Sequence, residues 1–183
     1  MAVISIRDVG PRDGLQNKEP IDPQSRAWLA TALADAGLKE VEVASFVSPK
    51  AVPSMSAATE VVKALPQRQD VRWWALVSNA KGVELALEAG IRNITVTVSA
   101  SEGYSQKNVG SSTADAIAML GVIQGVVGNQ AELDVVVSCV LGSPFGDVTN
   151  PAPALAIVDA GLPLCPQLGL PWPTRPAPLP LVA

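Results

Sequence analysis

An arginine, a carboxylate and a carboxamide lie close together near the start of the sequence, at Arg12, Asp13 and Gln16. A guanidinium can stabilise negative charge that develops on a substrate oxygen, and a carboxylate is a preferred ligand of hard cations such as Mg²⁺. The three residues follow the β-branched run 3–9, which predicts a short strand, and the glycines and proline in 10–14 predict an irregular loop. In a parallel barrel, a loop after a strand lies at the catalytic face.

Four further strand-like runs occur at about 40–45, 71–78, 93–99 and 133–140, and a helix-compatible segment follows each of the first four of the five runs, from 3–9 to 93–99. Asp22-Pro23 predicts the start of a helix that stops at Gly37. Its expected buried face consists of Trp28, Leu29, Ala32, Leu33 and Ala36.

Two later helices have clear ends in the sequence. Residues 80–89 should end as a helix at Gly90, and another helix should open at Ser112 or Thr113. Its apolar residues Ile117, Leu120 and Ile123 have helical spacing. The third to fifth strands are almost continuously apolar, as expected when both faces of a parallel sheet are covered. Alternating strands and helices predict an α/β fold.

Composition is that of a soluble globular chain. The 183 residues are 48% hydrophobic and 16% charged, and no apolar run approaches the roughly 20 residues of a membrane-spanning helix. A net charge of -4 argues against a nucleic-acid partner. Without a leader-like start and with only two cysteines, Cys139 and Cys165, we expect a reduced, cytoplasmic setting.

Four sequence blocks also carry a family resemblance. They are Gly-Pro-Arg-Asp-Gly-Leu-Gln-Asn from Gly10, Glu-Val-Ala-Ser-Phe-Val-Ser-Pro-Lys from Glu42, Ser-Ala-Ser-Glu from Ser99, and Val-Ser-Cys-Val-Leu-Gly from Val137. In order and spacing they resemble hydroxymethylglutaryl-CoA lyase over about residues 3–159. The Arg-Asp-Gly-x-Gln pattern is shared with isopropylmalate and homocitrate synthases, whereas Ser-Phe-Val-Ser-Pro-Lys singles out the lyase.

The resemblance implies an architecture and an activity. Residues 1–160 would form about five of the eight βα units of a TIM barrel. The activity would be cleavage of 3-hydroxy-3-methylglutaryl-CoA to acetyl-CoA and acetoacetate, with an acyl-CoA as substrate and a homo-oligomer as a possible assembly.

The resemblance also implies roles for individual residues. Asp13 would be a ligand of Mg²⁺ or Mn²⁺, and Arg12 would bind substrate and stabilise the enolate. Gln16 and Ser45 would position the substrate, and Glu42 would orient Arg12.

Each assignment has a purely structural alternative. Asp13 before a glycine could be a turn residue, and Arg12 could pair with a surface carboxylate. Glu42 could be a solvent-facing strand residue, and Ser45 a small polar residue of the kind common at strand ends. Cys139, within an apolar run, is expected to be a core residue rather than a nucleophile.

Several features depart from the family pattern. The sequence has no histidine, whereas the family takes metal ligands from a later His-x-His pair and a later asparagine. The ligand set is therefore incomplete, and we expect a truncated, inactive lyase chain. Two alternatives stay open: a Claisen-type acyltransferase of the isopropylmalate and homocitrate synthase group, and a non-catalytic half-barrel.

The composition changes near Gly161. Residues 163–183 contain seven prolines and one charged residue, Arg175, which predicts an irregular tail over 161–183. One interpretation is a proline-rich linker. We favour the other, out-of-frame translation, because codons permitted for residues 170–177, read two bases further on, encode Ala-Leu-Ala-Asp-Thr-Thr-Gly, which resembles the next strand-end motif of the family.

Overall fold

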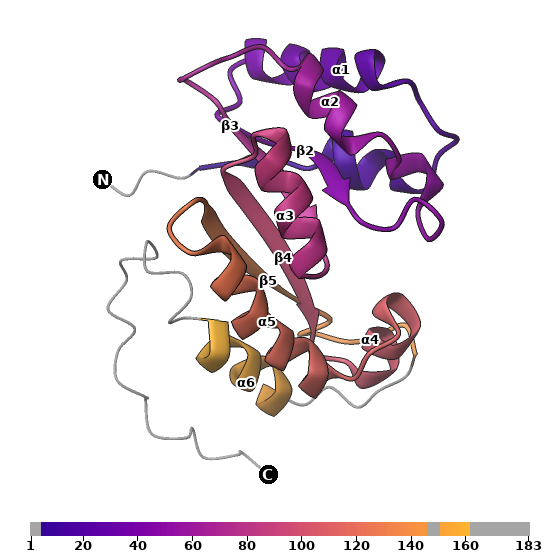
Figure 1. Cartoon of the computed structure of the whole chain (residues 1–183). Coiled ribbons are helices and arrows are strands. Elements are labelled where there is room, and N and C mark those ends of the chain that lie inside the picture. Colours follow the sequence, from indigo (N-terminus) through magenta and orange to yellow (C-terminus); the bar gives the residue numbers. More distant parts are fainter. Residues whose placement is uncertain (1–4, 146–150, 162–183) are drawn as a thin grey trace.

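The computed structural model describes residues 5–145 and 151–161 (Figure 1). Its centre is one five-stranded sheet in which neighbouring strands run parallel and follow each other in sequence order. The strands are β1 (Arg7–Asp8), β2 (Glu40–Phe46), β3 (Arg72–Val77), β4 (Asn93–Ser99) and β5 (Glu132–Ser138). This order, with helical crossovers, is that of the first five units of a (β/α)8 barrel, so the predicted α/β class and partial barrel are confirmed.

Six α-helices lie within the described residues. They are α1 (Pro23–Asp35), α2 (Ala58–Ala64), α3 (Ala80–Ala89), α4 (Glu102–Val109), α5 (Thr113–Val127) and α6 (Pro151–Gly161). Two single turns complete the described elements: a π-helical turn η1 (Gly10–Gly14) and a 3-10 turn η2 (Pro53–Met55). Within residues 5–145 and 151–161 no single helix is long and apolar enough to cross a membrane; the bent pair of α4 and α5 passes that test only jointly, by length and composition.

Helix ends fall where the sequence predicts them. The Asp22 carboxylate accepts a hydrogen bond from the Ser25 amide, and Pro23 is the first residue of α1. Helix α3 ends at Gly90, whose φ of 105° lies in the left-handed region that favours glycine. Ser112 caps α5 through the amide of Asp115. Local capping chemistry therefore sets these ends.

The predicted buried face of α1 is wrong for Trp28 and Ala36, whereas Leu33 does pack against the core. Trp28 is 69% exposed and Ala36 is exposed, while Leu29, Ala32 and Leu33 are half-buried. The buried residues are instead Arg26, Ala27, Ala30 and Ala34. Alanines occupy every side of this helix, so the larger side chains alone did not identify the packed face. The small residues allow α1 to approach the sheet closely.

The two faces of the sheet differ in polarity. Val41, Val43, Ile94, Val96 and Val98 face a continuous core that α1, α3, α5 and α6 complete. Because side chains alternate along a strand, the opposite face receives polar residues from every strand. The expectation that both faces of the later strands are covered is wrong for β5, where Val136 is 41% exposed. Helices pack on one face of this sheet, and β5 lies at its edge (Figure 1).

Some elements differ from the prediction in extent. Strand β1 covers Arg7–Asp8, and the chain turns into η1 at Gly10. Residues 5 and 6 are not in the strand, and residues 3 and 4 lie outside the described residues. Helices α4 and α6 were not predicted from the sequence. Cys139 lies just after β5, half-buried and with a positive φ, rather than inside the core. Helix α6 reaches Gly161, and the predictions for 162–183 lie outside the described residues.

Candidate active site

The turn that follows β1 presents Arg12 and Asp13 at the carboxyl end of the sheet. The amides of Arg12, Asp13 and Gly14 all point at the Val9 carbonyl oxygen, at 3.1, 2.7 and 3.4 Å. The Gly10 amide donates to Asp8 Oδ1 at 2.8 Å, and a Cβ at Gly10 would lie 2.9 Å from that oxygen and push the Asp8 carboxylate aside. The predicted irregular loop is thus an ordered π-helical turn.

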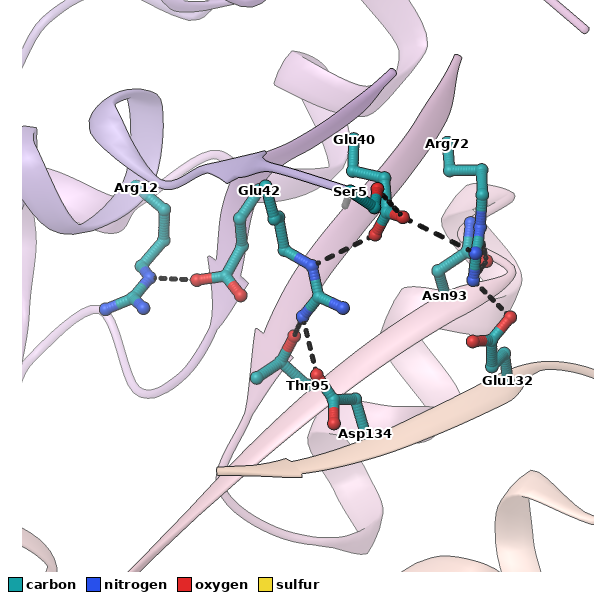
Figure 2. Close-up of polar contacts among 10 residues, drawn as sticks. Ser5, Arg12, Glu40, Glu42, Arg72, Asn93, Thr95, Glu132 and Asp134 are labelled. Carbon is teal, nitrogen blue, oxygen red and sulfur yellow. Dashed lines mark hydrogen bonds and ion pairs between the residues drawn. The ribbon is translucent and has the colours of Figure 1, made fainter. Parts of the chain in front are cut away.

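Arg12 is the centre of the polar cluster at this end of the sheet. Its Nε donates to Glu42 Oε1 at 2.5 Å, as Figure 2 shows, and its Nη1 donates to Asp13 Oδ1 at 2.8 Å and Gln16 Oε1 at 3.4 Å. Glu42 is 1% exposed, whereas Asp13 is 60% exposed. Four of the five predicted site residues therefore meet in space, although their roles stay predictions.

A β-bulge in β2 sets the face on which its polar residues lie. Glu42 pairs with Trp74, but Ala44 pairs with Ala75, so Val43 is the extra residue. After this irregularity Ser45 pairs with Leu76 and returns to the face that carries Glu42. Ser45 is buried there. In the described part of the chain no hydrogen bond joins it to Arg12, Asp13, Gln16 or Glu42.

The Arg12 side chain is 13% exposed, and one of its nitrogens has no hydrogen-bond partner among the described residues. Glu42 balances the guanidinium charge from the buried side, and no hydrogen bond within residues 5–145 and 151–161 uses Arg12 Nη2. The Asp13 carboxylate lies on the exposed side. A ligand oxygen approaching the strand ends would therefore meet a fixed cation and an accessible carboxylate.

The described residues do not form a metal site by themselves. No group of three or more histidine, cysteine, aspartate or glutamate residues that could hold an ion occurs within 5–145 and 151–161. Asp13 is exposed and already ion-paired to Arg12. A hard cation takes six or more oxygen ligands, so a single carboxylate does not fit a resident metal without further donors.

A second polar cluster, missed by the sequence analysis, lies on the same face of the sheet toward the amino ends of the strands. Arg7 binds Glu40 Oε2 at 3.4 Å, Thr95 Oγ1 at 3.2 Å and Asp134 Oδ2 at 2.8 Å. Figure 2 shows Glu40, Thr95 and Asp134, with Arg72, Asn93 and Glu132 beside them. The sequence signal that could have revealed this cluster is a polar residue at alternate positions of otherwise apolar strands, as at Glu40 and Glu42 in β2.

The charges of this second cluster act on Glu40. Burial by itself would raise the pKa of the Glu40 carboxyl. The hydrogen bond from Ser5 and the positive charges of Arg72 and Arg7 outweigh burial, so the pKa lies below its ordinary value. Glu40 is therefore held as a carboxylate by its neighbours.

Comparison with known proteins places this geometry in a family. Residues 3–159 match the HMGL-like family. The chain is 43% identical over 148 residues to a Pseudomonas aeruginosa protein named 3-hydroxy-3-isohexenylglutaryl-CoA/hydroxy-methylglutaryl-CoA lyase, covering 79% of this chain and 49% of that protein. The crystal structure of hydroxymethylglutaryl-CoA lyase from P. aeruginosa superimposes with a TM-score of 0.81 at 37% identity, over 88% of this chain and 55% of that chain.

A second solved structure is similar in fold and contains ligands. It is an HMG-CoA lyase from Acinetobacter baumannii in complex with coenzyme A and 3-methylmalate, with a TM-score of 0.84 at 26% identity, over 88% of this chain and 53% of that chain. The present chain thus spans about half the length of the relatives it matches. The parallel half-barrel is the fold of these lyase structures, and residues 3–159 match the family model. The chain therefore belongs to the HMGL-like family.

Proposed function

We propose that this chain supplies the first half of an active site that cleaves 3-hydroxy-3-methylglutaryl-CoA to acetyl-CoA and acetoacetate. The observation that carries the proposal is the Arg12 cluster, in which a buried carboxylate fixes a guanidinium at the strand ends. The names of the P. aeruginosa and A. baumannii relatives support a lyase rather than a synthase. The coenzyme A in the A. baumannii structure supports an acyl-CoA substrate.

The reaction makes two demands on a protein. The tertiary hydroxyl of the substrate must lose its proton, and that carbon then becomes the ketone of acetoacetate as the carbon-carbon bond breaks. The electron pair of the broken bond moves into the thioester part, which leaves as an enolate and takes up a proton to give acetyl-CoA. Negative charge therefore develops on the thioester oxygen during the step.

Arg12 is placed to answer the second demand. A fixed guanidinium aimed at a developing oxyanion lowers the barrier because its orientation costs nothing during the reaction. Glu42, on the buried side, holds Nε at 2.5 Å and keeps the guanidinium plane in place. Gln16, on the next turn of chain, contacts the same guanidinium and would help to hold the substrate.

The remaining assignments depend on groups beyond the described residues. A divalent cation would orient the substrate oxygens and acidify the hydroxyl, but Asp13 is the single candidate ligand in the described cluster. We therefore propose Asp13 as one ligand of a set completed from outside residues 5–145 and 151–161. Ser45 would contact the substrate from the adjacent strand end.

A chimera tests the proposal. Residues 3–159 would replace the matching segment of the P. aeruginosa relative, which supplies the rest of the barrel. We expect this chimera, with Mn²⁺, to release acetoacetate from 3-hydroxy-3-methylglutaryl-CoA, and an Asp13→Asn version to lose metal-dependent activity. Near-UV circular dichroism and metal binding by the parent chimera confirm that it has folded.

Two outcomes would overturn the proposal. One is a folded, metal-bound chimera that releases no acetoacetate. The other is a chimera that condenses acetyl-CoA with a 2-oxo acid instead, which would favour the synthase alternative. A chimera of the same design carrying Asp159→Asn, far along the chain from the cluster, is the matched control for loss of a carboxylate.

A further inference from the structure

The loop after β2 contacts the segment that carries Gln16. Ser54, in η2, donates its hydroxyl to the Gln16 carbonyl oxygen at 2.5 Å, although the two residues are 38 positions apart. Ser54 is buried. Because η2 follows β2 and Gln16 follows η1, this hydrogen bond joins the first two loops at the carboxyl end of the sheet.

A buried arginine in turn holds η2. Arg26, in the first turns of α1, is 1% exposed. Its Nη1 donates to the Ser56 carbonyl oxygen at 2.9 Å, and its Nη2 lies 3.5 Å from Met55 Sδ. No carboxylate of the described residues pairs with it, its Nε has no hydrogen-bond partner among them, and burial lowers its pKa.

The contacts of Arg26 all converge on one short segment. A guanidinium without a counter-charge is costly to bury, and a purely apolar residue would fill the same space without that cost. Here each polar contact of the Arg26 side chain goes to Met55 or Ser56, the residues directly after Ser54. Arg26 thus fixes the backbone from which the Ser54 hydroxyl reaches Gln16.

The last contact in the series reaches the Arg12 cluster. Gln16 Oε1 accepts from Arg12 Nη1 at 3.4 Å, on the side of the guanidinium away from Glu42. We propose that Ser54, held in place by Arg26, is a positioning residue that fixes Gln16 and thereby holds Arg12 against Glu42. This proposal builds on the proposed function of the Arg12 cluster, but its geometry can be tested without catalysis.

The experiment uses the 183-residue chain and the NMR signal of the Arg12 Nε–H group. An Arg12→Lys variant identifies the signal by its loss. In the parent chain we expect the Nε–H to exchange slowly with solvent, because it donates to a buried carboxylate. In Ser54→Ala we expect exchange to be roughly fivefold faster, since one net hydrogen bond no longer restrains the loop.

A matched control separates positioning from general loosening of the core. Ser105 is also a buried serine, and its hydroxyl has no hydrogen-bond partner among the described residues. Ser105→Ala should leave Arg12 Nε–H exchange unchanged. Arg26→Met should act like Ser54→Ala, and Arg26→Lys, which keeps a donor for the Ser56 carbonyl, should restore slower exchange in part.

The result that would overturn the proposal is equal Arg12 Nε–H exchange in Ser54→Ala and Ser105→Ala. If Ser54→Ala fails to fold, Ser54→Thr and Ser54→Val decide the same question, because they have the same shape and differ by the hydroxyl. Faster Arg12 Nε–H exchange in Ser54→Val than in Ser54→Thr supports the positioning role of Ser54, and equal exchange in the two variants contradicts it. The readout is hydrogen exchange and not activity. A chimera without lyase activity would therefore reject the proposed function without affecting the conclusion that Ser54 positions Arg12.

Discussion

Two arginines five residues apart, Arg7 and Arg12, pair with two glutamates on the same face of β2, Glu40 and Glu42. Arg7 also reaches Thr95 on β4 and Asp134 on β5, and its guanidinium carbon lies 3.4 Å from the centroid of the Trp74 ring. Among residues 5–145 and 151–161, the side-chain hydrogen bonds of Arg12 go to β2 and to its own loop, and none goes to β3, β4 or β5.

The difference shows how one motif is used for two purposes. Arg7 contacts residues of the other four strands. Its charge is neutralised by carboxylates of β2 and β5, and these contacts connect the strands on the polar face of the sheet. Arg12 is fixed from one side by a buried carboxylate and keeps an exposed carboxylate beside it. The first arrangement ties the strands of the sheet together, and the second is compatible with the substrate contact proposed for Arg12.

The largest expected effect is the absence of lyase activity, because the described residues of the Arg12 cluster lack a complete set of metal ligands. Arg7 has all its observed partners within the described residues. Those residues contain no group of three or more histidine, cysteine, aspartate or glutamate side chains that could hold a metal ion, around Arg12 or elsewhere. We expect the 183-residue chain to release no acetoacetate from 3-hydroxy-3-methylglutaryl-CoA even with Mn²⁺ supplied. A coupled assay with a no-protein control measures this, and release above that control would contradict it.

Replacing Arg12 in the active chimera should affect the chemical step. Arg12→Gln should lower kcat by about two to three orders of magnitude while KM changes little, because the charge it opposes appears in the transition state. Steady-state kinetics measure both constants. A raised KM with an unaltered kcat would mean that Arg12 only binds substrate, and Arg92→Gln, at an exposed site, is the control.

Replacing Arg7 should affect folding more than chemistry. Arg7→Met leaves Glu40 and Asp134 without this partner at partly buried positions, and we expect the free energy of unfolding to fall by about 2 kcal/mol. Urea unfolding of the 183-residue chain measures this. Arg92→Met, which removes an exposed arginine bonded to backbone carbonyls, should change stability by about 0.5 kcal/mol or less. Equal losses in the two variants would contradict the structural role of Arg7.

The smallest expected effect is on pH dependence. The pKa of Glu40 is lowered in the folded chain, so its contribution to stability is present above the unfolded-state pKa, ordinarily 4.5, and is lost as pH falls through the folded-state value. Glu40→Gln should therefore flatten the loss of stability below about pH 4.5. Urea midpoints at several pH values test this, with Glu19→Gln, at an exposed residue, as control. An unchanged slope would show that Arg7 and Arg72 do not act on Glu40.

Much of the fold was readable from local chemistry. The ends of α1, α3 and α5 followed from Asp22, Gly90 and Ser112, because caps act over a few residues of chain. The strand positions followed from apolar runs, and the order of strands and helices indicated the α/β class. The buried face of α1 could not be predicted from the sequence, because alanines lie all around this helix and only packing decides which of them are buried.

The sequence by itself determined which residues could form the site, through the spacing of Arg12, Asp13 and Gln16 and the blocks that resemble a lyase. The resemblance already implied that Glu42 lies beside Arg12, and only the tertiary structure decided that Glu42 is buried there and that the bulge at Val43 returns Ser45 to the same face. It alone revealed that Ser54 and Arg26 reach the segment of Gln16, and that Arg7 spans the sheet. These contacts join residues about 30 to 127 positions apart. Such pairs are set by strand register and helix packing, which no local pattern of residues encodes.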